Sequence, residues 1–372
     1  MSNRFKTPIT TSGIAAVSVG AVAALLLGCA HANRPGMEQT APTFAVAGAL
    51  LSNVRNVVGR LVETQTVSLA LDRIDQRELP LDRTYRHQGT GRGVVVYVFD
   101  GGVMGTHPEI AGRVRKGYDA FDSDPDVCNS HGTAVAGAIA GKTLGVAPEA
   151  EIVDIKMVEC GKLRGTIKAI VDGTEWVIED QKTHGRRSVA NWSFIADTAS
   201  RIPQLDSAVA QLLAAGIPVI VSAGNLEINA CRVSPGNAEG TIVVGASSIV
   251  RTPGTSRVVD RRSYNTAYGP CVDIYAPGDS VLLPSFDASR APSLQLWNGT
   301  SMSAGYVSGA VALFLEAQPL AHPEDVTRHI RETATKNVVH ESGSPFSRML
   351  YVGPVREELK SVAEIRAAMA RR

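Results

Sequence analysis

Three residue types that can act together as a nucleophilic catalyst occur in separate motifs of this sequence. Ser301 lies in Asn-Gly-Thr-Ser-Met-Ser-Ala-Gly (298–305), at the start of a run of small residues that favours a helix. Asp100 ends the apolar run 94–99, and His131 opens His-Gly-Thr-Ala-Val-Ala-Gly (131–137). A serine hydroxyl becomes nucleophilic when an imidazole takes its proton, and a carboxylate holds that imidazole in the required tautomer. The three residues therefore predict a serine hydrolase.

A fourth residue, Asn225, could bind the negative charge that forms on the attacked carbonyl oxygen. It follows Val-Ile-Val-Ser-Ala-Gly (219–224), which is typical of a buried strand that ends in a tight turn. Such a turn would leave the side-chain amide free to donate a hydrogen bond. We therefore predict Asn225 as an oxyanion donor.

Each motif taken alone has an ordinary structural interpretation. Asp-Gly-Gly after a strand is most often a turn, and His-Gly-Thr and Gly-Thr-Ser are common at helix starts. Ala-Gly-Asn is a common exit from a strand. The hydrolase prediction rests on their conjunction, because all four lie at a strand end or a helix start, where open α/β sheets collect their functional groups.

Elements that could position these residues alternate along the chain. Short apolar segments between amphipathic ones predict an α/β fold with a doubly wound, mostly parallel sheet and helices on both faces. The expected strands are 94–99, 152–158, 188–191, 218–222, 241–246 and 348–352. The expected helices are 131–140, 166–183, 204–215, 300–317 and 323–335.

The composition is that of an ordinary globular protein. The chain has 372 residues, of which 44% are hydrophobic and 20% charged, and its formal net charge is +1. This balance offers no electrostatic attraction for a polyanion, so we expect no nucleic-acid partner.

The two ends of the chain differ from the region between them. Residues 1–32 have the form of a secretory signal peptide, because Arg4 and Lys6 precede an apolar run of small residues. Two exits remain open: Leu-Leu-Gly-Cys (26–29) resembles a bacterial lipobox, which would leave a lipid on Cys29 as a membrane anchor, and Ala-His-Ala (30–32) suits ordinary signal peptidase. We expect a short pro-region or tether at 33–64, the catalytic domain at 65–353 and a helical extension at 354–372.

The cysteines indicate an oxidising compartment. No Cys-x-x-Cys pair is present, so we expect neither zinc binding nor thiol–disulfide exchange. Without Cys29 an even set remains, and it allows three pairings: Cys128, Cys160, Cys231 and Cys271.

From about Gln65 to Tyr351 the sequence resembles the proteinase K-like subtilases, with the strongest likeness to the bacterial aqualysin branch. The catalytic order aspartate, histidine, serine is that of subtilisin. Further matches are Leu-Asp-Arg-Ile-Asp-Gln-Arg-Glu-Leu-Pro-Leu-Asp (71–82), Gly93–Gly102, Val-Ala-Asn (189–191), Tyr-Gly-Pro-Cys-Val-Asp (268–273) and Gly-Ser-Pro (343–345).

The resemblance implies a subtilisin-like fold and a serine endopeptidase that cleaves proteins through an acyl-enzyme. Ser301 would be the nucleophile, His131 the general base and acid, Asp100 its orienter and Asn225 an oxyanion donor. It also implies the disulfides Cys128–Cys160 and Cys231–Cys271. The expected partners are protein or peptide substrates, which would bind in extended form, and we expect a monomer.

The resemblance also implies one structural calcium site. Five side chains with hard oxygen ligands, as Ca²⁺ prefers, coincide with ligand positions of the aqualysin branch: Asp72, Asp75, Gln76, Asp82 and Thr84. The alternative is a solvated turn whose charges are paired, as in Asp72-Arg73. A second family site is expected to be lost, because Ser248 stands where an aspartate ligand is usual.

Several residues beside the predicted site depart from the family pattern. Gly101 replaces the Thr or Ser that usually follows the aspartate, Ala134 a frequent second histidine, and Gly305 a proline at the start of the serine helix. Ile195 replaces a glycine of the substrate strand and should crowd the cleft or change its specificity. These changes motivate an alternative function: a subtilase-fold binding or regulatory protein with attenuated catalysis.

Overall fold

The structure is a computed structural model that describes residues 61–122, 125–162, 164–196 and 200–354. The expected signal peptide, the expected tether up to residue 60 and the expected helix at 355–372 lie outside the described residues.

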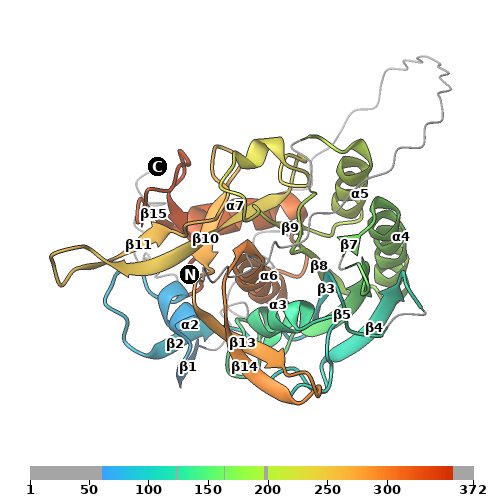
Figure 1. The fold of residues 1–372 in the computed structure, drawn as a ribbon, viewed down its shortest axis with the longest axis horizontal. Coiled ribbons are helices and arrows are strands. Elements are labelled where there is room, and N and C mark those ends of the chain that lie inside the picture. Colours follow the sequence, from blue (N-terminus) through green and yellow to red (C-terminus); the bar gives the residue numbers. More distant parts are fainter. Residues whose placement is uncertain (1–60, 123–124, 163, 197–199, 355–372) are drawn as a thin grey trace, which may run out of the picture.

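A sheet of 11 strands forms the middle layer of the described chain (Figure 1). Its main order is β15-β17-β12-β10-β9-β8-β3-β5-β4, and every pair from β17 to β4 is parallel. The bounds are β15 Thr335–Lys336, β17 Arg348–Met349, β12 Ile274–Pro277, β10 Ile242–Arg251, β9 Val219–Ser222, β8 Arg187–Trp192, β3 Val94–Asp100, β5 Glu151–Lys156 and β4 Val114–Asp119. The predicted mostly parallel sheet is confirmed.

Helices cover both faces of this sheet. One face carries α2 (Leu69–Ile74), α3 (His131–Ala140), α6 (Thr300–Ala317) and α7 (Pro323–Thr333); the other carries α4 (Ile167–His184) and α5 (Pro203–Ala214). Strand β3 shows why its sequence is uniformly apolar. Val94, Val96 and Val98 enter the core under α3 and α6, whereas Val95, Tyr97 and Phe99 enter the core under α4 and α5. A strand buried on both faces has no place for polar alternation.

Three predicted strands end at other residues in the structure. The strand expected at 152–158 stops at Lys156, and the chain then forms β6 (Val158–Glu159), which pairs with β7 (Arg164–Gly165). The strand expected at 241–246 continues to Arg251, because β11 (Val258–Arg262) folds back on it and pairs antiparallel. The expected strand 348–352 keeps only its first two residues in β17.

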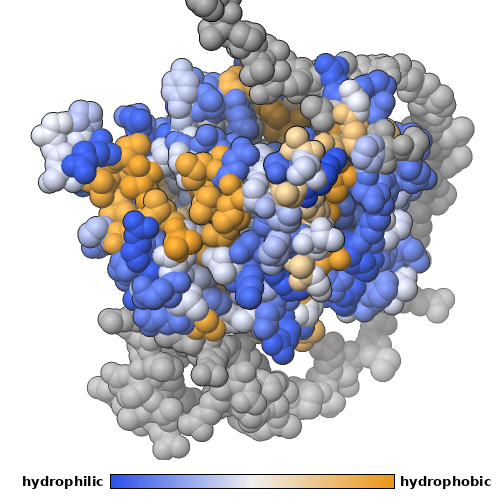
Figure 2. All heavy atoms as spheres, turned by 60° about the horizontal axis from the view of Figure 1, so that its bottom comes forward, coloured by the Kyte–Doolittle hydropathy of each residue, from blue (hydrophilic) through white to orange (hydrophobic). Residues whose placement is uncertain are grey.

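Other elements were not predicted. Strand β1 (Leu61–Gln65) pairs with β2 (Thr84–Gln88), β16 (Val339–His340) pairs with β11, and a 3-10 turn spans Ala230–Arg232. A hairpin joins β13 (Val281–Phe286) to β14 (Pro292–Trp297). On β14, Leu294 is 50% and Leu296 is 59% exposed, so that strand has no buried face to mark it in the sequence. Figure 2 brings the side of the molecule at the bottom of Figure 1 forward and shows apolar areas among polar ones.

Close packing of α3 on α6 brings the histidine and serine helices together. A Cβ on Gly305 would lie 2.9 Å from the Cβ of Ala138 and 3.1 Å from the carbonyl oxygen of Val135. These separations are too short for a larger side chain, which would push the two helices apart. Gly305, which departs from the family proline, therefore fits this contact.

None of the helices in the described residues is both long enough and apolar enough to cross a bilayer.

Candidate active site

The predicted catalytic residues lie where the connections of the sheet reverse direction. Asp100 is the last residue of β3, His131 the first of α3, and Ser301 the second of α6. From β3 the chain passes to β5 and β4 on one side and later to β8 and β9 on the other. Ligand sites of open α/β sheets lie outside the carboxyl ends of strands at such a reversal.

Asp100 and His131 form the pair that general-base catalysis requires. The carboxylate Oδ2 of Asp100 lies 2.7 Å from Nδ1 of His131, and the side chains are 7% and 32% exposed. Burial disfavours the imidazolium, but the charge and hydrogen bond of Asp100 outweigh it and raise the pKa of His131. Asp100 engages Nδ1, so Nε2 is the ring nitrogen left for a general base of this type to use.

The backbone of Gly101, which stands where the family pattern has Thr or Ser, forms a hydrogen bond with the Asp100 carboxylate. Oδ1 of Asp100 accepts a 2.7 Å hydrogen bond from the N–H of Gly101. A Cβ on Gly132 would lie 2.5 Å from the carbonyl oxygen of Gly102, so the start of α3 approaches this turn as closely as a glycine allows.

Ser301 is buried and close to the substrate strand. Its hydroxyl donates to the carbonyl oxygen of Ser193 at 3.1 Å, rather than to His131. Ser193 is itself fixed, because its hydroxyl lies 2.9 Å from Oδ1 of Asn191 and 3.1 Å from the carbonyl oxygen of Ser301. Rotation about the Cα–Cβ bond is the movement that redirects the Ser301 hydroxyl, and catalytic hydrogen bonds commonly tighten when substrate binds.

Asn225 presents its amide nitrogen to the cleft. Its Oδ1 accepts from the N–H of Thr300 at 2.9 Å and from the Thr300 hydroxyl at 3.0 Å. Because a backbone N–H can only donate, the oxygen must face Thr300 and Nδ2 must point away from it. A Cβ on Gly299, which has φ 136°, would lie 3.1 Å from this nitrogen, so glycine keeps the space open.

A cleft of about 510 Å³ adjoins Ser301. Its walls include Ser193–Ile195 after β8, Gly224–Leu226 after β9, and Met157 and Gly165 on the β6–β7 side. Of the four predicted catalytic residues, Ser301 and Asn225 therefore line this cleft, and Asp100 and His131 form a separate hydrogen-bonded pair that is not part of its lining.

Sequence reasoning missed three residues that affect this site. The carbonyl oxygen of Ser193 accepts a hydrogen bond from the Ser301 hydroxyl, and Trp297 lies edge-on to His131 with ring centroids 6.2 Å apart. Asp154 lies on β5, beside β3. An acidic residue inside an otherwise apolar strand, Ile-Val-Asp-Ile (152–155), was the available signal for Asp154.

Asp154 is 4% exposed, and only one of its two carboxyl oxygens accepts a hydrogen bond. Its Oδ2 accepts from the N–H of Val103 at 3.1 Å, whereas Oδ1 is buried without a hydrogen-bond partner. Burial raises the pKa of Asp154 to about 7, and the negative charges of Asp100 and Asp119 act in the same direction.

We expect Asp154 to make stability fall as pH rises. The pKa of Asp154 in the folded state lies above the usual 3.8, so proton binding by this carboxyl stabilises the folded protein. This stabilisation is complete below about pH 4 and lost by about pH 7. We compare the free energy of unfolding of Asp154→Asn with that of its parent. Between pH 4 and pH 8 this difference should shift by up to about 4 kcal/mol in favour of the variant. Denaturant unfolding in a Ser301→Ala background, which prevents autolysis, measures this shift.

The matched control for this experiment is Asp126→Asn. Asp126 is exposed, and its hydrogen bond with Lys116 lowers its pKa, so its effect should run in the opposite direction and be small. A difference between Asp154→Asn and its parent that does not change with pH would contradict the assignment.

Both disulfides implied by the resemblance are present. Cys128 is bonded to Cys160 and Cys231 to Cys271. The first packs beside the catalytic turn, since the N–H of Cys128 donates to the carbonyl of Gly101 at 2.7 Å. A disulfide here restricts the unfolded chain and holds this turn in the folded one.

The residues predicted to bind calcium lie in one loop region, but several of their carboxylate oxygens already accept hydrogen bonds from protein N–H groups. Asp72 belongs to α2, and its carboxylate accepts from the N–H groups of Asp82 at 3.1 Å and Arg83 at 2.7 Å. The Arg86 guanidinium binds Asp82 at 2.8 Å and approaches Asp75 to 3.7 Å. No group of three or more acidic, histidine or cysteine side chains in the described chain is arranged to hold a metal ion.

The other three predicted calcium ligands, Gln76, Thr84 and Asp75, differ in their hydrogen bonds. Gln76 turns its amide nitrogen toward the carbonyls of Glu78 and Pro80, and the hydroxyl of Thr84 accepts from Gln65 at 3.3 Å. Oδ1 of Asp75 is buried without a partner. Burial raises the pKa of Asp75 to about 7, and the charges of Asp72 and Asp82 add to this. Side-chain oxygens are the ligands that Ca²⁺ prefers. Oδ2 of Asp75 accepts from the N–H of Arg86 at 2.7 Å, and Oδ1 is the atom without a donor.

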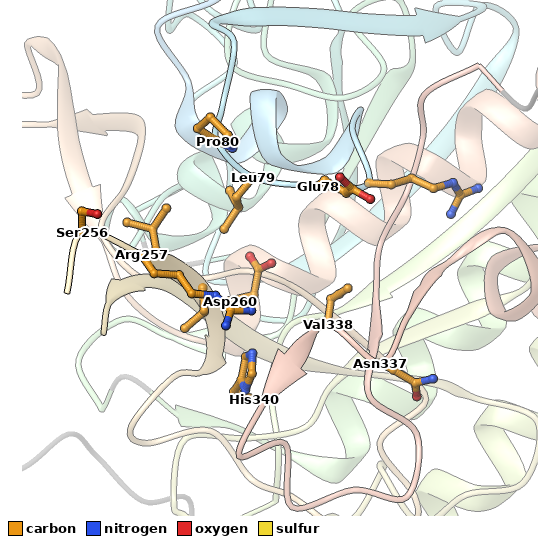
Figure 3. A pocket seen from close by; sticks show the side chains of 12 residues that line it. Glu78, Leu79, Pro80, Ser256, Arg257, Asp260, Asn337, Val338 and His340 are labelled. Carbon is orange, nitrogen blue, oxygen red and sulfur yellow. The ribbon is translucent and has the colours of Figure 1, made fainter. Parts of the chain in front are cut away.

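A second pocket, of about 540 Å³, lies beyond this loop and shares no lining residue with the active-site cleft (Figure 3). It is lined by loop residues 77–80, hairpin residues 256–260, and Asn337, Val338 and His340. Its charges are mixed, and the carboxylate of Asp260 is held at 2.7 Å by buried Arg73. The pocket therefore favours no particular class of ligand.

Comparison with known proteins agrees with the fold. The sequence profile of the Subtilase family matches residues 91–348. The chain is 37% identical over 286 residues to the extracellular serine proteinase of a Thermus species, and 34% identical over 283 residues to alkaline serine exoprotease A of Vibrio alginolyticus. Each alignment covers 76% of this chain. The chain spans 65% of the first relative and 49% of the second.

Solved structures extend the likeness to three dimensions. A cold-adapted subtilisin-like serine proteinase superposes with a TM-score of 0.68 at 34% identity, covering 78% of this chain and all of that one. A Pseudoalteromonas arctica protease shares the fold with a TM-score of 0.60 at 24% identity, over 71% of this chain and 89% of its own. The chain belongs to the Subtilase family, as the sequence resemblance implied.

Proposed function

We propose that this protein is a serine endopeptidase that hydrolyses peptide bonds of proteins through an acyl-enzyme on Ser301. The observation that carries the proposal is the 2.7 Å contact between Asp100 and His131 beside a cleft that Ser301 and Asn225 both line. Family membership supports the same chemistry.

The proposed reaction uses each residue at a defined atom. His131 Nε2 takes the Ser301 proton as Oγ bonds to the scissile carbonyl carbon, and the carbonyl oxygen gains a negative charge. Asn225 Nδ2 donates to that oxygen. His131 then returns the proton to the leaving amine as the C–N bond breaks, and water repeats the sequence to release the acid. Asp100 stabilises the imidazolium in both halves.

Covalent labelling with a fluorophosphonate tests this proposal. The probe should label the full-length protein at Ser301, and labelling should disappear in Ser301→Ala and fall strongly in His131→Ala. Ser193→Ala removes a neighbouring serine hydroxyl and should still be labelled. A folded protein that stays unlabelled would instead support the alternative, a subtilase-fold binding or regulatory protein.

We also propose that the 72–84 loop binds a structural calcium ion. Asp72, Asp75 and Asp82, with Gln76 and Thr84 as further oxygen ligands, would have to turn toward a common centre to hold it, because the described side chains are not arranged around one. The charge of the ion would offset the repulsion among the three carboxylates. Buried Oδ1 of Asp75 supports this assignment.

Removal of calcium should lower the melting temperature. A ligand at a concentration 100 times its Kd stabilises by about 2.7 kcal/mol, or about 5–10 °C for a domain of this size. Calorimetry of the Ser301→Ala protein with calcium or with a chelator measures the shift, and Asp75→Ala should abolish it. An unchanged melting temperature after chelation would contradict the proposal.

Export from the cytoplasm is the localisation we propose. The signal-like sequence at 1–32 and the paired cysteines support it. Mass spectrometry of the mature N-terminus distinguishes lipid-modified Cys29 from an unmodified chain that starts at Asn33.

A further inference from the structure

Ile195 occupies part of the cleft wall beside the nucleophile. A Cβ built on Gly224, on the opposite wall, would lie 2.8 Å from Cδ1 and 3.2 Å from Cγ2 of Ile195. The isoleucine side chain therefore rests on the main chain of Gly224. Both residues line the same cleft as Ser301.

The backbone on each side of Ile195 is held in place. The carbonyl of Phe194 accepts from the Ser222 hydroxyl at 3.3 Å, and the N–H of Ala196 donates to the carbonyl of Ser234 at 2.8 Å. The Phe194 ring also stacks on buried Trp192, with centroids 5.3 Å apart. Ile195 cannot move away from Gly224 by a shift of its main chain unless these contacts break.

A bound substrate must use the space next to this contact. The scissile carbonyl carbon must reach Oγ of Ser301 while its oxygen faces Nδ2 of Asn225. The residue that supplies this carbonyl is called P1. Ser193–Ile195 and Gly224–Asn225 line the cleft of about 510 Å³ beside Ser301, so a P1 side chain that enters this part of the cleft meets Ile195 where it packs on Gly224.

We propose that Ile195 restricts P1 to glycine, alanine or serine, an inference that rests on the proposed peptidase function. A small P1 side chain needs no displacement of the isoleucine. A leucine or phenylalanine would have to push Ile195 off its packed position, and overpacking of this kind is unfavourable. Misfit in an apolar pocket changes kcat/KM by about 10–200-fold per methylene group.

Three peptide p-nitroanilides that differ only at P1, as alanine, leucine or phenylalanine, test the inference. For the full-length wild-type protein, kcat/KM for alanine should exceed that for phenylalanine by about tenfold or more. Ile195→Gly should raise the ratio of kcat/KM for phenylalanine to kcat/KM for alanine by about tenfold or more. Ile195→Ala should give an intermediate selectivity, and it replaces the glycine variant if that variant does not fold.

The control is Ile249→Gly, which removes an isoleucine from β10 outside the cleft and should keep wild-type selectivity. Fluorophosphonate labelling counts the active sites before each measurement. A labelled wild type that cleaves after phenylalanine as readily as after alanine overturns this inference and leaves the proposed function standing. A folded wild type that is not labelled overturns both.

Discussion

Replacing Ser301 with alanine is expected to lower kcat on a peptide substrate by about 10⁶-fold, a magnitude that corresponding changes have in subtilisin itself. The variant keeps the cleft and Asn225 but has no atom that can form the acyl-enzyme. Turnover of a chromogenic peptide by a known concentration of protein measures the loss.

Ser303→Ala is the matched control on the same helix. Its hydroxyl lies 3.0 Å from the carbonyl of Ala276 and 3.2 Å from that of Pro277, so it is turned away from the cleft. We expect kcat close to that of the parent. A Ser301→Ala protein that retained about a tenth of the parent turnover would show that another group performs the reaction.

Asp100→Asn should reduce kcat by about 10⁴-fold, because an amide cannot hold the imidazole in the productive tautomer or stabilise its cation. The variant also tests the pKa of His131. Neutral imidazole is the base, so kcat/KM rises with pH through this pKa. Burial alone would lower the pKa of His131, and Asp100 raises it. Loss of the carboxylate should therefore move the acidic limb of the pH profile to lower pH.

Asn225→Ala is expected to reduce kcat by about 10²–10³-fold with little change in KM, again a magnitude known from subtilisin. The lost hydrogen bond forms fully only when the carbonyl oxygen carries negative charge, so substrate binding should be largely retained. Initial rates over a range of substrate concentrations separate the two parameters.

A second variant distinguishes this role from a structural one. Alanine at position 225 also removes the acceptor for the N–H and hydroxyl of Thr300. Asn225→Asp keeps that acceptor but places a negative charge where the donor was. Its kcat should fall at least as far as that of Asn225→Ala. Normal turnover by the aspartate variant would contradict the oxyanion role.

The candidate catalytic residues could be predicted because each lies in a distinctive local motif. Asp100 follows a strand with apolar residues on both faces, and Asn225 follows another, so the ends of both strands were visible in the sequence. Ser301 and His131 precede runs of small residues that form helices α6 and α3. Strand and helix boundaries depend on such short-range patterns.

Strand β14 of the β13–β14 hairpin escaped prediction because its sequence carries no such pattern. Five of the six residues of β14 are exposed, so neither burial nor alternation marks the strand. Its position depends on contacts with distant elements: Gly137 of α3 lies against Pro284, and Nε2 of His107 donates to the carbonyl of Ser293 at 3.0 Å. Trp297 reaches His131 only because the hairpin is placed in this way.

The sequence by itself determined which chemical groups this protein can offer, their order along the chain and the alternation of elements that carries them. It could not determine distances. Asp100 and His131 are 31 residues apart, and Ser301 and Ser193 are 108 apart, yet each pair is joined by a hydrogen bond. Only the tertiary structure brings such groups together, because helices and strands from distant parts of the chain must pack before they can meet. The same packing sets Ile195 against Gly224 and leaves Asp154 buried beside the site.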